Sequence, residues 1–575
     1  MSVCCLLAVA GCGGGGSGRG DKDADLDAGA DSGTDADGDA GGDSDTGTGT
    51  GTGEDGGEDA GEDASADAGE DAGTKLPPTT VAETIVGLLP AADQKGENRD
   101  KWGLTKTGPG EPYLPRDDLG VGDGTSEPLG PPSSIGYIWH ITDAQICDEE
   151  SPARLINGDS MYESAYRTQE SWGALMLDAA VRTGNAFAAK RPFDFLMVTG
   201  DMVDNKQGNE LSLFLGVLEG GEVNPDSAKD DDPIPGPGND QHDPFEAEGV
   251  SPLVPWYDTL GNHDDLILGN FATLDWLVAD PTGTIVSALS AAVRPTCLDH
   301  PWYPAESVTP ARCDMPPKSY FKSMITAPDP ARAFYSRDDW LAAHFGTRTG
   351  PDGHGFTEDN LNTGNAYYAI EGVLPGVPSR LIVLDTVAAE FQDGEIDDAQ
   401  FAWFVTELDS AEAAGEVIIV ASHHPVSWVK GKGAAFTAAM NAHPNVILHL
   451  AGHTHMNRIT PHPAKNGDPP ENGYWEVETS AMLVWPSQMR FVEIVDNRDG
   501  TGDIYCTMVN YRIPQGPHVL DGARFYSLYD VQNGSNENGE GRPEDRNAIL
   551  RFAWPQAIAD TLADVPHADV ESLNF

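Results

Sequence analysis

Runs of apolar residues that end abruptly in polar residues predict a series of buried strands. An apolar run without alternation is typical of a strand covered on both faces of its sheet. Each run below ends in Asp or has Asn or His within two residues of its end. The runs span residues 135–143, 193–201, 254–260, 381–385, 417–422 and 446–452. Polar side chains therefore gather where strands end, which is where α/β sheets carry their chemistry.

Helical patterns separate several of these predicted strands. Residues 164–189 place Trp172, Leu175, Met176 and Ala179 at helical spacing, and residues 399–408 have a similar pattern. Alternating strands and helices predict an α/β fold. Three later segments of mixed polarity predict strands nearer the sheet edges, at 474–480, 489–495 and 503–511.

The chain of 575 residues divides by composition into a tail, an arm and a large folded part. We expect a signal peptide at 1–12, an acidic tether at 13–76, an extended arm at 77–132, a catalytic domain at 133–515 and a C-terminal extension packed on it at 516–575. The tether is rich in Asp, Gly and Ala and has too little apolar surface to offset the entropy of ordering. Within the arm, residues 81–89 predict a short helix.

The first residues resemble a bacterial lipoprotein signal. Leu6 to Ala10 form an apolar run, and Gly11 precedes Cys12, the residue that would accept the lipid. The absence of Lys or Arg before this run departs from the usual pattern. The resemblance implies an exported protein anchored to the cell envelope, in contact with the membrane only through its lipid.

The net charge of −59 excludes a nucleic-acid partner, because phosphate backbones are bound by clustered Lys and Arg. It also favours a small substrate over a polyanion. In an exported protein the cysteines of the folded part could form disulfides. We expect a local bridge between Cys297 and Cys313, and consider one between Cys147 and Cys506.

Two inserts interrupt the predicted strands. Residues 205–253 are rich in Asp, Pro and Gly and predict a loop excursion. Residues 265–366 carry many aromatic residues and predict a small packed cap beside the strand ends, where it would shape substrate access.

Five short blocks at successive strand ends supply carboxylate, amide and imidazole groups. They are Asp143-Ala-Gln145, Gly200 to Asp204, Gly261 to Asp264, His423-His424 and Gly452 to His455. These donors suit Mn, Fe or Zn, and a shared carboxylate can hold two ions close together. Two such ions can hold a hydroxide between them for in-line attack on phosphorus.

This set of motifs resembles the calcineurin-like metallophosphoesterase superfamily, whose motifs run D-x-H, GDxxD, GNH(D/E), H and GHxH. The match covers residues 135–500 in the right order. The resemblance implies a four-layer αββα sandwich of two mixed sheets flanked by helices. It also implies hydrolysis of a phosphomonoester or phosphodiester, with a small phosphate ester as the substrate.

The resemblance gives each matching residue a role. Asp201 would bridge the two ions, and Asp143, Gln145 and His455 would complete the first. Asn262, His423 and His453 would complete the second, with His424 as the alternative to His423. His263 would be the proton donor and Asp264 would orient its ring.

One residue departs from the family pattern. The first motif ends in Gln145 where the family has His, and an amide oxygen is a weaker donor than imidazole. Gln145 could bind weakly, water could take the position, or the first ion could be lost. Asp204 could compensate as a ligand, or could only shape its loop by a hydrogen bond. An alternative function is therefore a non-catalytic surface protein that keeps the fold with an impaired first metal site.

Other polar residues are expected to be structural. His140 lies within a predicted strand and is expected to be a core histidine. His344 and His354 lie in the second insert and are expected at the surface. Arg490 could bind phosphate or form an exterior ion pair.

Overall fold

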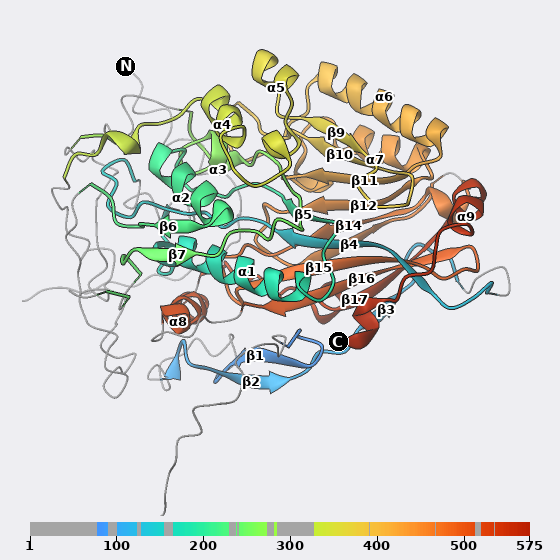
Figure 1. The fold of residues 1–575 in the computed structure, drawn as a ribbon, viewed down its shortest axis with the longest axis horizontal. Coiled ribbons are helices and arrows are strands. Elements are labelled where there is room, and N and C mark those ends of the chain that lie inside the picture. Colours follow the sequence, from blue (N-terminus) through green and yellow to red (C-terminus); the bar gives the residue numbers. More distant parts are fainter. Residues whose placement is uncertain are drawn as a thin grey trace, which may run out of the picture. The chain divides into compact units, whose positions relative to one another are not determined.

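Two mixed β-sheets form the centre of the folded part (Figure 1). The computed structural model of the chain describes residues 78–89, 101–122, 128–154, 165–228, 237–238, 241–272, 281–283, 327–389, 391–465, 467–511, 519–533 and 535–575. All of these residues belong to one compact unit, residues 71–575.

The first sheet has six strands in the order β13-β14-β12-β11-β10-β9. Its inner strands are parallel and the two edge strands are antiparallel to their neighbours. Every second residue faces the other sheet, so Leu381 and Val383 join the main core while Ile382 and Leu384 face the opposite side. The strands are β9 (Tyr368–Glu371), β10 (Ser379–Leu384), β11 (Val417–Ser422), β12 (Val446–Ala451), β13 (Arg458–His462) and β14 (Tyr474–Glu478).

The second sheet has seven strands in the order β3-β17-β16-β15-β4-β5-β8. β4, β5 and β8 are parallel, whereas β15, β16 and β17 form an antiparallel set beside them. The strands are β3 (Leu114–Arg116), β4 (Ser133–Ile141), β5 (Phe195–Val198), β8 (Trp256–Asp258), β15 (Gln488–Asp496), β16 (Thr501–Asn510) and β17 (Ala548–Ala553).

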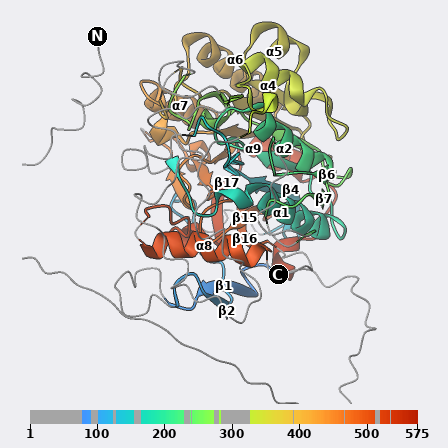
Figure 2. The same ribbon diagram turned by 90° about the vertical axis from the view of Figure 1, so that its left-hand side faces the viewer.

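Helices cover the outer faces of both sheets. α6 (Asp398–Ala414) and α7 (Gly433–Ala442) bury Phe404 and Phe436 against the six-stranded sheet. α1 (Gly173–Ala188) and α8 (Val519–Asn533) lie on the far side of the seven-stranded sheet (Figure 2). The order helix, sheet, sheet, helix confirms the predicted four-layer α/β fold.

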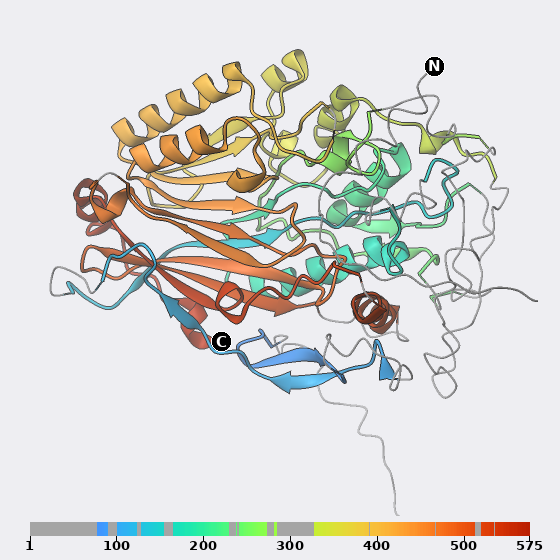
Figure 3. The same ribbon diagram turned by 180° about the vertical axis from the view of Figure 1, so that it is seen from behind.

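The arm differs from its prediction. Residues 81–89 do not form a helix, because Glu83–Gly87 is strand β1, paired antiparallel with β2 (Thr105–Pro109). Three consecutive residues of β1, Thr84, Ile85 and Val86, are all β-branched, and such residues favour strands. The ribbon lies beside α8 (Figure 3). The arm also supplies β3 to the edge of the large sheet.

Neither insert is as simple as predicted. The first contains α2 (Gly208–Glu219) and the ribbon of β6 (Gly221–Val223) with β7 (Phe245–Ala247), so it is not a loop excursion. Glu210 caps the start of α2 by accepting the backbone N–H groups of Asn205 and Gln207.

The second insert contains α4 (Arg337–His344) and α5 (Glu358–Thr363) in its described part. His344 and His354 are buried, which corrects their expected surface position. His344 pairs with Asp258 at 2.9 Å, and His354 stacks on Trp256. The described part of this insert therefore packs on the β8 edge of the large sheet.

The C-terminal extension completes the fold. It supplies α8, α9 (Gln556–Leu562) and β17, which pairs with β16 and β3 inside the large sheet. Part of it, residues 535–541, crosses the strand ends of the six-stranded sheet: Gly539 accepts from Asn457 and donates to Trp485.

Several expectations concern other parts of the chain. Cys147 and Cys506 are both buried free thiols, so the bridge considered between them is absent. Cys12, the tether at 13–76, and Cys297 with Cys313 lie outside the described residues. Within the described ranges, no helix has both the length and the apolar character needed to span a membrane.

Candidate metal centre

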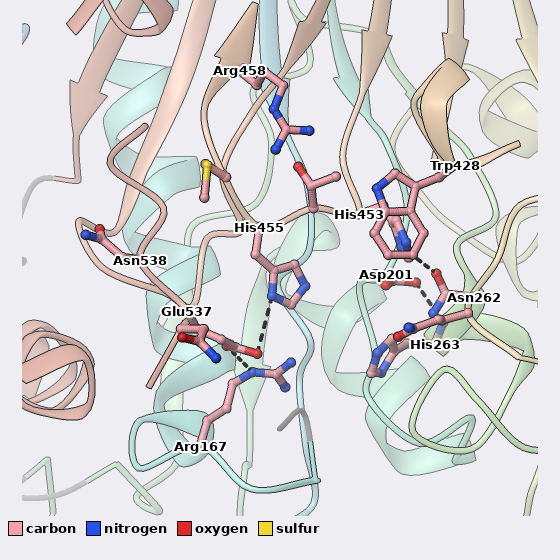
Figure 4. Close-up of a pocket in the computed structure, with 14 residues that line it drawn as sticks. Arg167, Asp201, Asn262, His263, Trp428, His453, His455, Arg458, Glu537 and Asn538 are labelled. Carbon is pink, nitrogen blue, oxygen red and sulfur yellow. Dashed lines mark hydrogen bonds and ion pairs between the residues drawn. The ribbon is translucent and has the colours of Figure 1, made fainter. Parts of the chain in front are cut away.

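The predicted ligands follow the carboxyl ends of neighbouring strands. β4 and β5 run parallel in the large sheet, and β11 and β12 run parallel in the other, so their ends bring separate motifs to one place. Figure 4 shows side chains from these loops around one pocket. The structure brings together all seven predicted ligands, which are Asp143, Gln145, Asp201, Asn262, His423, His453 and His455.

Glycines allow the loops of this site to approach closely. A Cβ atom on Gly261 would lie 2.2 Å from Asp201 Oδ1, and one on Gly452 would lie 2.1 Å from Thr142 Oγ1. Neither contact is tolerable, so the motifs need glycine at these positions. Gly452 allows a loop of the six-stranded sheet to approach the end of β4 in the other sheet, and Gly261 allows two loops of the seven-stranded sheet to approach each other.

Strained backbone marks the same residues. Asp143, Gln145, Asp201, His453 and His455 all have positive φ, between 42° and 69°. This left-handed conformation is costly for residues with a Cβ and persists where surrounding structure enforces it. The shared strain indicates that the fold holds these side chains in fixed directions.

One group of donors centres on Asn262. Its Oδ1 lies 2.9 Å from His423 Nε2 and 3.1 Å from His453 Nδ1. The other end of the amide donates to the Gly269 carbonyl at 3.1 Å, which turns Oδ1 toward the histidines. Asp201 Oδ2 lies 3.1 Å from His423 Nε2. These atoms belong to the residues predicted to hold the second ion.

The structure favours His423 over His424 as a donor. His423 Nδ1 donates to the Thr199 carbonyl at 2.7 Å, which leaves Nε2 directed at Asp201 and Asn262. Such a bond through the other nitrogen is typical of a metal-binding histidine. Both nitrogens of His424 are engaged, by Thr386 and the Gln392 carbonyl.

A second group of donors centres on Asp143. Its Oδ2 accepts from Thr142 and from the His453 backbone, and its Oδ1 lies 3.3 Å from His455 Nε2. Gln145 Nε2 lies 3.2 Å from the same His455 nitrogen. Gln145 Oε1 is buried and accepts no hydrogen bond from any described residue. Rotation of the amide would exchange the two atoms and present oxygen to this point.

The carboxylates of both groups favour positive charge. Burial disfavours the His455 cation, yet Glu537 and Asp143 raise its pKa to about 10. Burial likewise opposes the His423 cation, and Asp201 raises that pKa to about 9. Carboxylates that stabilise the protonated form of buried histidines also stabilise a metal cation that binds in place of those protons.

His263 is oriented by Asp204 and not by Asp264. Its Nδ1 lies 3.0 Å from the Asp204 backbone carbonyl oxygen and 3.1 Å from Asp204 Oδ1, which leaves Nε2 as the nitrogen that makes no hydrogen bond to a described residue. The predicted role of Asp264 is therefore wrong. Its carboxylate accepts backbone N–H groups from Asp201, Met202 and Gly261 and so fixes the loop that carries Asp201.

Two residues near the site were not predicted. Glu537 lies 3.6 Å from His455 Nδ1, and its other oxygen accepts from Arg167 Nε at 2.6 Å. Arg167 also lies 3.5 Å from Asp204. Residues 533–541 are polar and glycine-rich, which is the pattern of an exposed loop, so the sequence carried no sign of a site residue there.

The site opens into a cavity of about 440 Å³ (Figure 4). No described residue of the 265–366 insert lines it, so the cap predicted to shape access does not form its described wall. Beside the site residues, the wall includes Arg167, Gln392, Trp428, Arg458, Asn536 and Asn538. Arg490 is buried and binds backbone carbonyls and Asn457, so neither role considered for it is observed.

The donors fit a metal centre. Donor atoms of Asp143, Asp201 and His423 lie within 4.8 Å of one another, as do those of His423, His424 and His453. The donors are carboxylate, amide and imidazole groups, with no thiolate among them, which suits Mn, Fe or Zn. Rotation of the Gln145 amide would bring its unpartnered Oε1 toward the first group as one further oxygen.

The sequence comparisons identify the family. Residues 136–457 match the family described as calcineurin-like phosphoesterase, and the chain belongs to this family. Membership supports hydrolase activity in general and implies a dinuclear metal centre. No curated protein sequence matches the chain.

Two solved structures are similar to this chain. One is a dimetal phosphatase from Danio rerio, with 11% identity, a TM-score of 0.35, and coverage of 66% of this chain and 100% of that one. The other is the purple acid phosphatase PPD1 from seeds of yellow lupin (Lupinus luteus), with 10% identity, a TM-score of 0.27, and coverage of 70% and 54%.

Proposed function

We propose that this protein is a metal-dependent phosphoesterase that hydrolyses a small phosphomonoester or phosphodiester. The supporting observation is the convergence of the predicted donors beside His263, whose Nδ1 is held by Asp204 within the cavity. The first ion would be held by Asp143, Gln145 and His455. The second ion would be held by Asn262, His423 and His453, and Asp201 would bind both ions. When bound, the two ions supply an activated water and neutralise charge on the phosphoryl oxygens.

The chain's own residues supply the remaining chemistry. With Nδ1 engaged by Asp204, Nε2 of His263 is the atom that would donate a proton to the leaving oxygen. Asp204 stabilises the protonated ring: burial opposes the cation, but Asp201 and Asp204 raise the pKa of His263. Arg167 and Arg458 line the cavity and would attract an anionic substrate.

The test measures metal content and hydrolysis together on the full chain. The protein is purified without chelator, its metals are counted by elemental analysis, and para-nitrophenyl phosphate and its bis ester are assayed with added manganese or zinc. We expect about two ions per chain. His263→Ala should keep them and lose about 100- to 10,000-fold in kcat. His567→Ala, at a half-exposed histidine far along the chain, is the matched control.

Two results would contradict the proposal. A wild-type chain that binds no metal would remove its basis, and full activity in His263→Ala would remove the proton donor. The alternative, a non-catalytic binding protein with an impaired first site, has only Gln145 in its support. It predicts one ion per chain and activity only in Gln145→His.

We also propose that the chain is an exported lipoprotein anchored through Cys12. The support is the apolar run before Cys12 and the acidic segment after it. In a bacterial host, labelled fatty acid should be incorporated into the wild type and not into Cys12→Ser. Equal labelling of both would contradict the proposal.

A further inference from the structure

We propose that Glu537, in the C-terminal extension, is a positioning residue for the metal centre. It would hold the ring of His455 through Nδ1, so that Nε2 faces the first metal site. The inference rests on the proposed function, because it concerns the same site. It assigns a role in that site to a segment that lies outside the family match, which ends at residue 457.

The geometry of His455 supports this role. Its Nε2 faces Asp143 Oδ1 at 3.3 Å and Gln145 at 3.2 Å, while its Nδ1 faces Glu537 Oε1 at 3.6 Å. The ring therefore lies between the donors of the first site and a carboxylate behind it. Figure 4 shows His455 and this carboxylate, Glu537. A carboxylate behind a metal-binding histidine fixes its tautomer and raises its basicity.

Arg167 holds Glu537 in place from the other side. Its Nε donates to Glu537 Oε2 at 2.6 Å, and its NH1 lies 3.5 Å from Asp204. The side chain of Arg167 is 1% exposed and that of Glu537 is 12% exposed, so solvent does little to screen the pair. Arg167 thereby joins the carboxylate behind His455 to the carboxylate behind His263.

Backbone bonds place the segment of Glu537 accurately. Asn457, two residues after His455, donates its backbone N–H to the Gly539 carbonyl at 3.0 Å, and Gly539 donates to Trp485 at 2.7 Å. Glu540 accepts from the Trp485 indole at 2.9 Å. The segment is therefore attached to the loop that carries His455, and these bonds fix the position of Glu537 relative to that loop.

This arrangement offers a compensation for Gln145. The amide is a neutral donor, so the first site depends more strongly on the basicity of His455 than a site with a second imidazole would. A carboxylate behind His455 increases that basicity and adds negative charge near the ion. The first site, and not the second, should therefore respond when Glu537 is changed.

The experiment titrates metal-free full-length protein with manganese in a calorimeter. Glu537→Gln keeps the size of the side chain and removes its charge. We expect one of the two binding steps to weaken by about 10- to 100-fold and the other to stay unchanged. Glu544→Gln removes a charge from the C-terminal extension at a part-exposed side chain paired with Arg542, away from His455, and should bind both ions as the wild type does. Equal affinities in Glu537→Gln and the wild type would overturn the inference.

A purely structural role predicts a different result. Glu537→Gln would then lower the melting temperature of the metal-free protein while the folded fraction bound both ions normally. If Glu537→Gln does not fold, NMR of labelled histidines in the zinc-loaded wild type gives the answer. The resonance assigned to His455 by its loss in His455→Asn should show a proton on Nδ1. A deprotonated Nδ1 would overturn the inference.

These readouts separate this inference from the proposed function. Should wild-type protein bind two ions but hydrolyse no ester, the proposed function fails and the titrations still decide the role of Glu537. Should wild type hydrolyse esters while Glu537→Gln binds metal normally, the inference alone fails.

Discussion

The six-stranded sheet carries histidine and carboxylate side chains at two positions along the same strands. Within the strands, Ser422 of β11, His449 of β12 and Glu476 of β14 form a buried row. His449 Nε2 lies 2.8 Å from Ser422 Oγ, and its Nδ1 lies 3.0 Å from Glu476. A few residues further along, beyond the ends of β11 and β12, His423 and His453 face the metal site.

The two clusters use similar residues and have different properties. Ser422 and Glu476 also bind backbone, at the His424 carbonyl and the Val426 N–H, so the row is engaged throughout. None of its members lines the cavity. The cluster at the strand ends has strained backbone, a buried Gln145 oxygen without a described partner, and an opening to the cavity. Polar groups that lack a hydrogen-bond partner and lie on strained backbone indicate a ligand site. Polar groups whose hydrogen bonds are all made within the protein indicate a structural role.

The largest effect should follow a change in the shared carboxylate. Asp201→Asn should bind neither ion tightly, because its oxygens serve both sites. The loss of metal assistance is worth several kcal/mol, so hydrolysis should fall by about 1,000-fold or more. Elemental analysis and initial rates measure both effects. Retention of two ions and activity would show that Asp201 does not bridge them.

A substitution in the buried row should lower the free energy of unfolding and leave the metal content unchanged. Glu476→Gln leaves His449 without its carboxylate partner in the sheet interior, and should destabilise the protein by about 3 kcal/mol. Chemical denaturation of the wild type and the variant measures the difference. The folded variant should still bind two ions. A loss of ions in Glu476→Gln would erase the distinction between the two clusters.

The pH dependence of stability should also identify the buried row. Burial opposes ionisation of Glu476, but its hydrogen bonds and charge interactions with His449 and His462 lower its pKa below the ordinary value. A lowered carboxyl pKa contributes stability above the unfolded-state pKa of about 4.3, and that stability is lost as the pH falls below it. The difference in free energy of unfolding between the wild type and Glu476→Gln should therefore become smaller on acidification. Parallel denaturation curves at pH 7 and pH 3.5 with an unchanged difference would contradict this.

The smallest effect should follow Gln145→His. Imidazole is a stronger donor than an amide for these metals, so affinity at the first site should rise by about 10-fold. Calorimetric titration with zinc measures the change, and the second step should stay as it is in the wild type. An unchanged first step would mean that residue 145 does not reach the ion.

The sequence predicted the strand ends because the signal there is local. Apolar runs such as 417–422 stop at polar residues, and the structure places Asp143, Asp201, Asn262, His423 and His453 in direct contact around one point. These features follow from strand periodicity and from motifs of only a few residues, so one sequence is enough to find them.

The remaining features depend on contacts between distant parts of the chain. Glu537 reaches His455 because β17 and residues 535–541 fold back along the sheets, and nothing in its polar surroundings marks it. Asp204 and Asp264 are both adjacent to site motifs, and only the loop geometry decides which one faces His263. Residues 81–89 contain strand β1 in place of the predicted helix because the pairing partner, β2, lies elsewhere in the arm.

The most direct test is a crystal structure of the full-length protein grown with manganese, with the ions located by anomalous scattering. Two peaks should lie about 3.5–4 Å apart. One should lie among Asp143, Gln145 and His455, the other among Asn262, His423 and His453, with Asp201 between them. A single peak, or a peak beside His449 and Glu476 with none at the strand ends, would contradict the assignment of the metal centre.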